Sequence, residues 1–144
     1  MKTLKTLIKL GQKELDKLLI NKKTLLIQKE QILNQIRSEI IGRQEEQAKF
    51  ANSEYSFFLE KFMQNSLSNQ KKLESKFISI EHQIIEIEEN ITKAFAEVKR
   101  FEILMQKKQL ELYNKAKIAE SKNLDEITIM KAARESQINT GSKD

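Results

Sequence analysis

The stretch from Leu73 to Met105, LESKFISIEHQIIEIEENITKAFAEVKRFEILM, decides the fold of this chain. Its apolar residues recur at alternating intervals of four and three, which is the heptad repeat of a helix that packs along one face. Polar residues such as Glu88 and Lys99 fill the positions between them. The repeat comprises Leu73, Phe77, Ile80, Ile84, Ile87, Ile91, Ala94, Val98, Phe101 and Met105. We call this row of apolar positions the seam.

The first half of the chain carries a similar row. Its members are Leu4, Ile8, Leu15, Leu18, Leu25, Ile32 and Ile36, and Leu19, Leu26, Leu33 and Ile40 broaden it on one side. This pattern predicts a second long amphipathic helix. Gly11 falls within the row, where a missing side chain lets another backbone approach or is simply a tolerated weak point.

The composition supports helices throughout. The chain of 144 residues contains no Pro, no Cys and three Gly, and 33% of its residues are charged. Little in it interrupts a helix, and without cysteine it has no disulfide framework. We therefore predict an all-α fold, a long two-helix antiparallel coiled-coil hairpin spanning residues 1–138, with a frayed tail at 139–144.

Two segments are candidates for the chain reversal. One lies at about 50–54, where Ser53 can cap a new helix, and the other is the polar stretch 65–69. A reversal at 50–54 sets Ile80 near Leu26, Ile87 near Leu19, Ile91 near Leu15 and Val98 near Ile8, apolar against apolar. The earlier hinge is therefore favoured, with helix one over about 3–50 and helix two reaching about 137.

The earlier hinge leaves the end of helix two, residues 106–137, without an internal partner. This overhang carries a thin apolar stripe of Leu112, Ala116, Ala119, Ile127 and Met130. Such a face is a natural docking surface for another protein. With the later hinge, the same stripe packs on helix one instead.

Four aromatic residues, Tyr55, Phe57, Phe58 and Phe62, lie close together in the sequence. Their helical angles spread over more than half the circumference, so they cannot all face one narrow seam. They are either exposed binding anchors or local packing that closes the end of the hairpin.

No catalytic or metal-binding pattern stands out. His82 has Glu86 one helical turn away, but one histidine and no cysteine cannot supply the usual ligands of a metal site. Acid–base chemistry by Glu86, Glu88 and Glu89 needs a concave, partly dry site, which a two-helix coiled coil lacks. We expect no enzymatic activity, no cofactor and no metal.

The charges favour proteins as partners. The 26 basic and 21 acidic residues alternate along the chain, so the net charge of +5 forms no basic block for nucleic acid. No stretch approaches the roughly 18 apolar residues of a membrane span, and Lys5 and Lys9 break the N-terminal apolar run that a signal peptide needs. A cytoplasmic location is expected.

Several pieces of the sequence, taken in order, resemble the FliJ family of flagellar type III export proteins and the related stalk proteins of virulence-type secretion systems. The first is Leu4-x-x-Leu7, and the second is Tyr55-x-x-Phe58-Leu59-x-x-Phe62. The third is the basic stretch from Lys99 to Lys108. The last runs from Glu120 through Leu124-Asp125-Glu126 to Lys131-Ala132-Ala133-Arg134.

The resemblance implies a hairpin similar to the central stalk of rotary ATPases, located in the cytoplasm at the inner face of the bacterial membrane. It implies three partners: a hexameric export ATPase, a membrane export gate and export chaperones, with the membrane reached through protein contacts alone. Tyr55, Phe58 and Phe62 would contact the export gate. The overhang stripe would contact the ATPase.

Two other functional interpretations of the sequence remain open. A homo-oligomeric coiled-coil scaffold would match its apolar stripes between chains, and it would be a stable dimer or larger in solution. A peripheral binder of anionic lipid or nucleic acid would show salt-sensitive binding through its positive charge.

Overall fold

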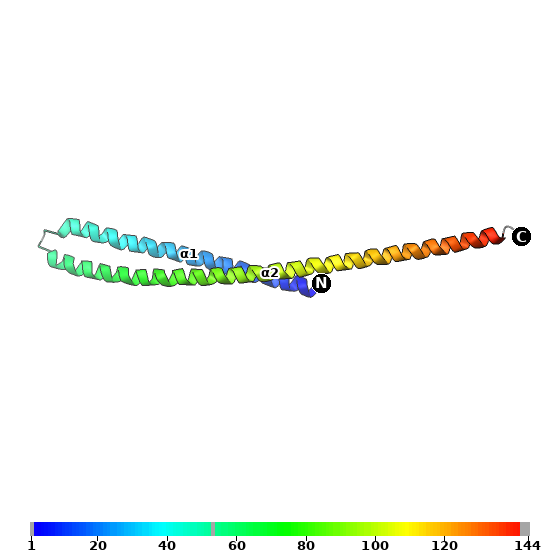
Figure 1. Ribbon diagram of the computed structural model, residues 1–144. Helices are drawn as coiled ribbons and strands as arrows, with labels where there is room; N and C mark the ends of the chain where they lie inside the picture. The colour runs from blue at the N-terminus through cyan, green and yellow to red at the C-terminus, as the bar shows by residue number, and fades with distance from the viewer. Residues whose placement is uncertain (1, 53, 142–144) are drawn as a thin grey trace. The chain divides into compact units, whose positions relative to one another are not determined.

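The computed structural model describes residues 2–52 and 54–141, with side chains to Ile138. The chain forms two helices, α1 (Lys2–Phe50) and α2 (Ser56–Gly141), shown in Figure 1. The two helices pack against each other, and no strand occurs among the described residues. The prediction of an all-α helical hairpin is confirmed.

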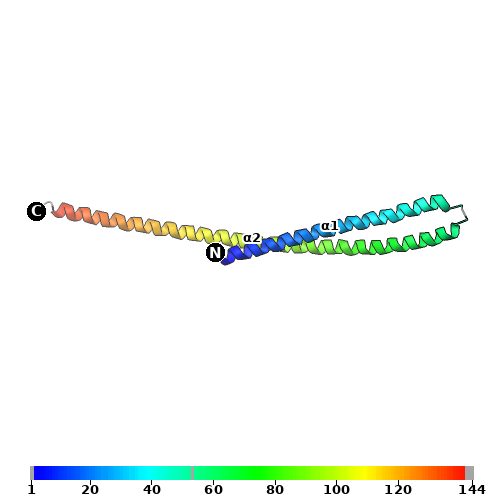
Figure 2. The same ribbon diagram turned by 180° about the vertical axis from the view of Figure 1, so that it is seen from behind.

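The chain divides into two compact units. The larger one, residues 9–98, is an antiparallel hairpin in which most of α1 lies beside the first half of α2 (Figures 1 and 2). The smaller one joins the first residues of α1, up to Ile8, to α2 from Lys99 onward. Each unit is described in turn.

Within the hairpin, the less exposed residues of α1 and α2 recur at alternating intervals of four and three. In α1 this row runs from Gly11 to Phe50, and in α2 it runs from Leu59 to Val98. Ile84 and Val98 are the described apolar side chains that become fully buried, at 7% and 5% exposure. Two helices cover only one face of each other, so the other seam residues remain half-exposed.

Three contacts set the register of the hairpin. Val98 packs at Gly11, Lys22 pairs with Glu88 at 3.3 Å, and Arg43 donates a hydrogen bond to Ser66. The pairing expected from sequence was therefore wrong by one helical turn, since Val98 lies against Gly11. That turn places Leu18 and Leu25 in the seam and leaves Leu19 and Leu26 exposed beside it.

The chain reverses between Phe50 and Ser56. The N–H of Ala51 still bonds to the carbonyl of Gln47 at 3.1 Å, and the N–H of Leu59 bonds to the carbonyl of Tyr55 at 3.1 Å. Ser53, the proposed helix cap, lies outside the described residues. The alternative hinge at 65–69 lies inside α2, so the chain does not reverse there.

A polar layer interrupts the apolar seam near this reversal. Ser66, only 4% exposed, donates a 2.6 Å hydrogen bond to Glu39 Oε2 and accepts one from Arg43 Nη1 at 3.2 Å. Arg43 Nη2 donates to Gln70 Oε1, and Gln70 donates to Glu74 at 2.8 Å. The part-buried bonds among Glu39, Arg43, Ser66 and Gln70 satisfy polar groups that the seam would otherwise bury unpaired.

Apolar periodicity alone missed the polar layer. The alternating four-and-three spacing of the seam continues through this region, but the seam positions hold polar residues. They are Glu39 and Arg43 on α1 and Ser66 and Gln70 on α2. Counting the spacing without regard to residue type would have identified all four. Their complementary side chains would then have indicated a buried hydrogen-bonded network.

In the smaller unit, Leu4 and Ile8 of α1 and Phe101 and Met105 of α2 are half-buried. Every side chain described from Gln106 to Ile138 is exposed. We call residues 106–138 the extension. The backbone of α2 stays helical to Gly141, and residues 142–144 of the tail that was expected to fray lie outside the described residues.

Candidate functional site

The end of the hairpin carries an aromatic cluster, which we call the tip cluster: Phe50, Tyr55, Phe57, Phe58 and Phe62. The Tyr55 ring contacts Phe50 edge-on, with ring centres 6.3 Å apart, and lies 6.4 Å from Phe58. Phe57 and Phe58 form a second edge-on pair at 6.0 Å. These are favourable geometries for aromatic pairs, and they join the end of α1 to the start of α2.

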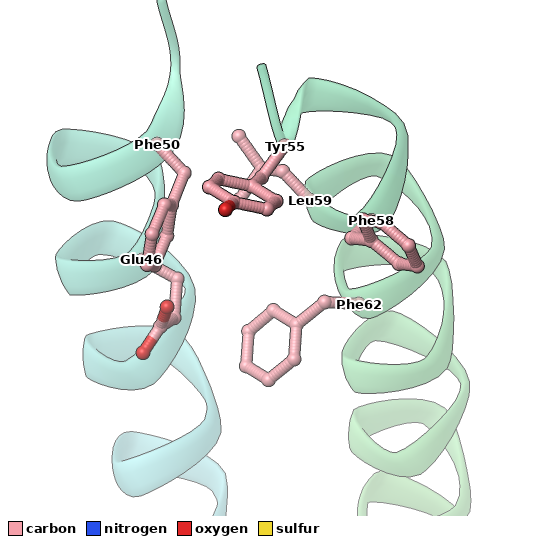
Figure 3. A pocket seen from close by; sticks show the side chains of 6 residues that line it. All are labelled: Glu46, Phe50, Tyr55, Phe58, Leu59 and Phe62. Carbon is pink, nitrogen blue, oxygen red and sulfur yellow. The ribbon is translucent and has the colours of Figure 1, made fainter. Parts of the chain in front are cut away.

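The tip cluster surrounds a hollow of about 440 Å³ between the two helices. Glu46 and Phe50 line it from α1, and Tyr55, Phe58, Leu59 and Phe62 line it from the other side (Figure 3). Glu46 is the only charged residue in this lining. The hollow is therefore suited to an apolar side chain, with a carboxylate available to a neighbouring cation.

The aromatic residues of the tip cluster differ in their contacts and in their exposure. Tyr55 packs between its neighbours and links the two helix ends, which is a structural role. Phe57 and Phe58 nevertheless remain 73% and 66% exposed, and Phe62 remains 43% exposed. Large apolar side chains that stay in water next to an apolar hollow are typical of a protein-binding surface.

The extension is the second candidate surface. The predicted stripe residues Leu112, Ala116, Ala119, Ile127 and Met130 are all exposed, three of them at 54–60%. Ile127 and Met130 line a shallow hollow of about 320 Å³ together with Lys131 and Arg134. This part of the stripe thus combines an apolar floor with two cationic side chains.

The extension also exposes apolar residues that lie off the stripe. They are Leu110, Tyr113, Ile118, Leu124, Ile129 and Ile138. The stripe was found by its spacing, whereas these residues follow no single row and were missed. Apolar side chains on more than one side of a helix are typical of a segment that is covered from more than one direction.

The seam residues lie where the two helices meet within each unit. Phe77, Ile80, Ile84, Ile87, Ile91 and Val98 are half-buried or buried in the hairpin, and Phe101 is half-buried in the smaller unit. Lys29 lies over the Phe77 ring, with its Nζ 5.4 Å from the ring centre. A lysine at a seam position is thus accommodated by a cation–π contact.

The described residues contain no group of three or more His, Cys, Asp or Glu that could hold a metal ion. His82 and Glu86 are both exposed on α2. No helix in the described part of the chain is long and apolar enough to cross a membrane. The tip cluster and the extension both expose large apolar side chains, which suits contact with proteins.

No protein-family model, no curated protein and no solved structure matches this chain.

Proposed function

We propose that this chain is a stalk-like component of the bacterial flagellar type III protein export apparatus. It docks to the hexameric export ATPase and to the membrane export gate, and it also handles export chaperones. The protein acts in the cytoplasm, at the inner face of the membrane, through protein contacts. The observation that carries the proposal is the extension, a long helical segment whose described side chains are all exposed.

An isolated helix in water gains little from its own hydrogen bonds, because most helical stability in proteins comes from tertiary packing. All of the described side chains of the extension are exposed, and they include large apolar residues such as Leu112, Ile127 and Met130. Burying these residues in a partner would stabilise the helix and remove apolar surface from water. A docking role explains both features at once.

We assign the two surfaces to different partners. The extension, through Leu112, Ala116, Ala119, Ile127 and Met130, contacts the ATPase. The tip cluster, through Tyr55, Phe58 and Phe62, contacts the export gate. Phe58 and Phe62 match positions that the export stalk family uses to bind the gate, and a long exposed helical end suits the pore of a hexameric ATPase.

The mechanism requires no chemistry on the chain's own residues. A ligand shifts a conformational equilibrium only by its differential affinity for the two states. A stiff helical protein that binds one conformation of the ATPase and one of the gate more tightly would favour both together. The coupling is then a binding free energy shared between two surfaces.

The first experiment measures ATP hydrolysis by the export ATPase with the full chain and with a truncated chain that ends at Met105. We expect the full chain to stimulate hydrolysis and the truncated chain to fail. Phe58→Ala with Phe62→Ala serves as the control, because it alters the tip cluster and leaves the extension intact. Equal hydrolysis with and without the full chain would overturn the proposal.

A pair of matched substitutions tests the stripe itself. Ile127→Glu places a charge on the stripe, and Ile129→Glu places the same charge at an exposed position off it. We expect the first to abolish stimulation and the second to retain most of it. Equal loss from both would show that the stripe has no special role.

A stalk protein of a virulence-type secretion system would use the same two surfaces. The genes that neighbour this one distinguish the two systems, since flagellar and injector genes form separate clusters.

A further inference from the structure

The hairpin of residues 9–98 has one apolar side and one polar side. Four residues of α1 flank the seam on the apolar side: Leu19, Leu26, Leu33 and Ile40. Three more, Ile20, Ile27 and Ile41, continue this apolar surface onto the face of α1 that is turned away from the seam. Five of these seven residues are 45–65% exposed. On the other side of the seam, the corresponding positions of α1 carry Glu14, Asn21, Gln28 and Gln35. A hairpin solvated equally on both sides would show no such difference.

Helix α2 borders the apolar side of α1 with both charged and apolar residues. In an antiparallel pair, positions that directly follow the seam on one helix lie beside the equivalent positions of the other. The ion pair between Lys22 and Glu88 shows this side directly, because Glu88 follows seam residue Ile87. Ile78 and Ile85, at 56% and 55% exposure, lie on the same side of α2. The α2 positions equivalent to Glu88 are Glu74, Glu81 and Phe95, so α2 borders this side largely with carboxylates, and the continuous apolar surface belongs to α1.

The charges along this surface follow an ordered pattern. Asp16, Lys23, Glu30 and Arg37 occur every seven residues, so they form one row between the apolar residues of α1. Their signs alternate along the row. The same row running in the opposite direction therefore presents the opposite sign at every position.

We infer that the apolar side binds a second copy of this chain, with the two α1 helices antiparallel about a two-fold axis between Leu26 and Ile27. In this arrangement Lys23 faces Glu30 of the second copy, and Asp16 faces its Arg37. Each pair occurs twice because the interface is symmetric. A parallel arrangement in register would set like charges against each other.

A second copy fits this surface better than an unrelated helix, because its charge order complements itself and the same register sets Ile20 against Leu33 and Leu26 against Ile27. The interface is expected to be small, because a standard complex buries roughly 800 Å² on each partner and the apolar residues of α1 that would be covered are already partly covered by α2. We therefore expect a reversible dimer with a micromolar dissociation constant. This self-association goes beyond the proposed export function and involves neither the tip cluster nor the extension.

The test is the mass of the full chain by sedimentation equilibrium, combined with charge reversal. We expect Lys23→Glu or Glu30→Lys alone to weaken the dimer about tenfold, since each places like charges together at two sites. The double variant should restore the dimer, because it rebuilds both pairs with exchanged signs. If Lys23 and Glu30 did not pair between two copies, the double variant would not restore the dimer.

Matched controls use the polar side of the same helix. Lys17→Glu and Glu14→Lys make the same charge changes at exposed positions and should leave the dimer unchanged. Circular dichroism checks that every variant keeps its helicity. A chain that stays monomeric at several hundred micromolar, or controls that weaken the dimer as much as the test variants, would overturn the inference.

Disulfide formation tests the antiparallel geometry independently, because the natural chain has no cysteine. Ile20 of one copy should lie opposite Leu33 of the other. Mixing Ile20→Cys with Leu33→Cys chains under oxidising conditions should give mixed dimers and few dimers of either variant with itself. Efficient self-linking of Ile20→Cys would contradict the antiparallel arrangement.

Discussion

The side chain of Val98 occupies the space beside Gly11 that a β-carbon would need. A β-carbon at Gly11 would lie 2.7 Å from Val98 Cγ2, which is too close for any unstrained contact. Val98 is also only 5% exposed, so it has little room to move away. The missing side chain at Gly11 is therefore part of how this layer of the seam packs.

Gly11→Ala should destabilise the hairpin by about 1 kcal/mol. Alanine favours the helix by about 1 kcal/mol over glycine, but overpacking a tight contact costs roughly 1–3 kcal/mol. Chemical denaturation gives the free energy of unfolding. Combining Gly11→Ala with Val98→Ala should relieve the clash, so the double variant should be more stable than the sum of the two single effects predicts.

Gly42→Ala provides the matched control, because a β-carbon there would meet nothing within 4 Å. The change should stabilise the protein by about 0.5–1 kcal/mol, the ordinary gain from replacing a helical glycine. If both glycine substitutions change stability equally, the contact with Val98 does not matter.

Arg43→Ala should destabilise the hairpin by about 1–3 kcal/mol, because it removes a donor to Ser66 and Gln70 in a part-buried layer. The exposed Arg100 is the control, and its replacement by Ala should change the unfolding free energy by less than about 0.5 kcal/mol. Thermal melting followed by circular dichroism makes the comparison. Equal losses at the two arginines would show that the network contributes nothing specific.

Replacing the whole polar layer with leucine should have the opposite effect on stability. Well-packed apolar residues in place of Glu39, Arg43, Ser66 and Gln70 avoid the desolvation of charged groups, so the melting temperature should rise. Register should become less well defined, because a polar layer within a seam specifies which residues pair. A leucine variant that melts at a lower temperature than the natural chain would contradict this prediction.

Phe58→Ala with Phe62→Ala should leave the helicity nearly intact and weaken binding to the export gate by about 1 kcal/mol or more. Phe58 is 66% exposed and Phe62 is 43% exposed, so neither ring is a buried part of the seam. Far-ultraviolet circular dichroism and a direct binding assay separate the two effects. Loss of helicity in this variant would instead make the two residues part of the packing at the hairpin end.

The extension should be the least protected part of α2 in the free protein. Amide hydrogens from Gln106 to Ile138 should exchange much faster than those around Ile84 and Val98, because local opening exposes no buried core there. Mass spectrometry after deuterium labelling measures the difference. Adding the ATPase should slow exchange in the extension if it is the docking segment, and unchanged exchange would count against that assignment.

Local sequence pattern was enough to predict the helices and the seam residues. Without proline, and with apolar residues every three or four positions, residues such as Ile80 and Ile87 can be buried along only one face of a helix. The exposure of the overhang stripe followed from the earlier of the two candidate hinges, which the apolar matching of the two helices favoured over the later one. These properties follow from spacing within a single helix.

The register between α1 and α2 was decided only by the tertiary structure. Sliding one helix by a turn keeps apolar residues opposite apolar residues, because Leu18 and Leu19 are equally good candidates for the seam. The bulk of Val98 beside the missing side chain of Gly11 distinguishes the two registers, as do the hydrogen bonds of the polar layer. These contacts depend on which residue of α1 lies opposite which residue of α2. The apolar periodicity of one helix does not specify that pairing.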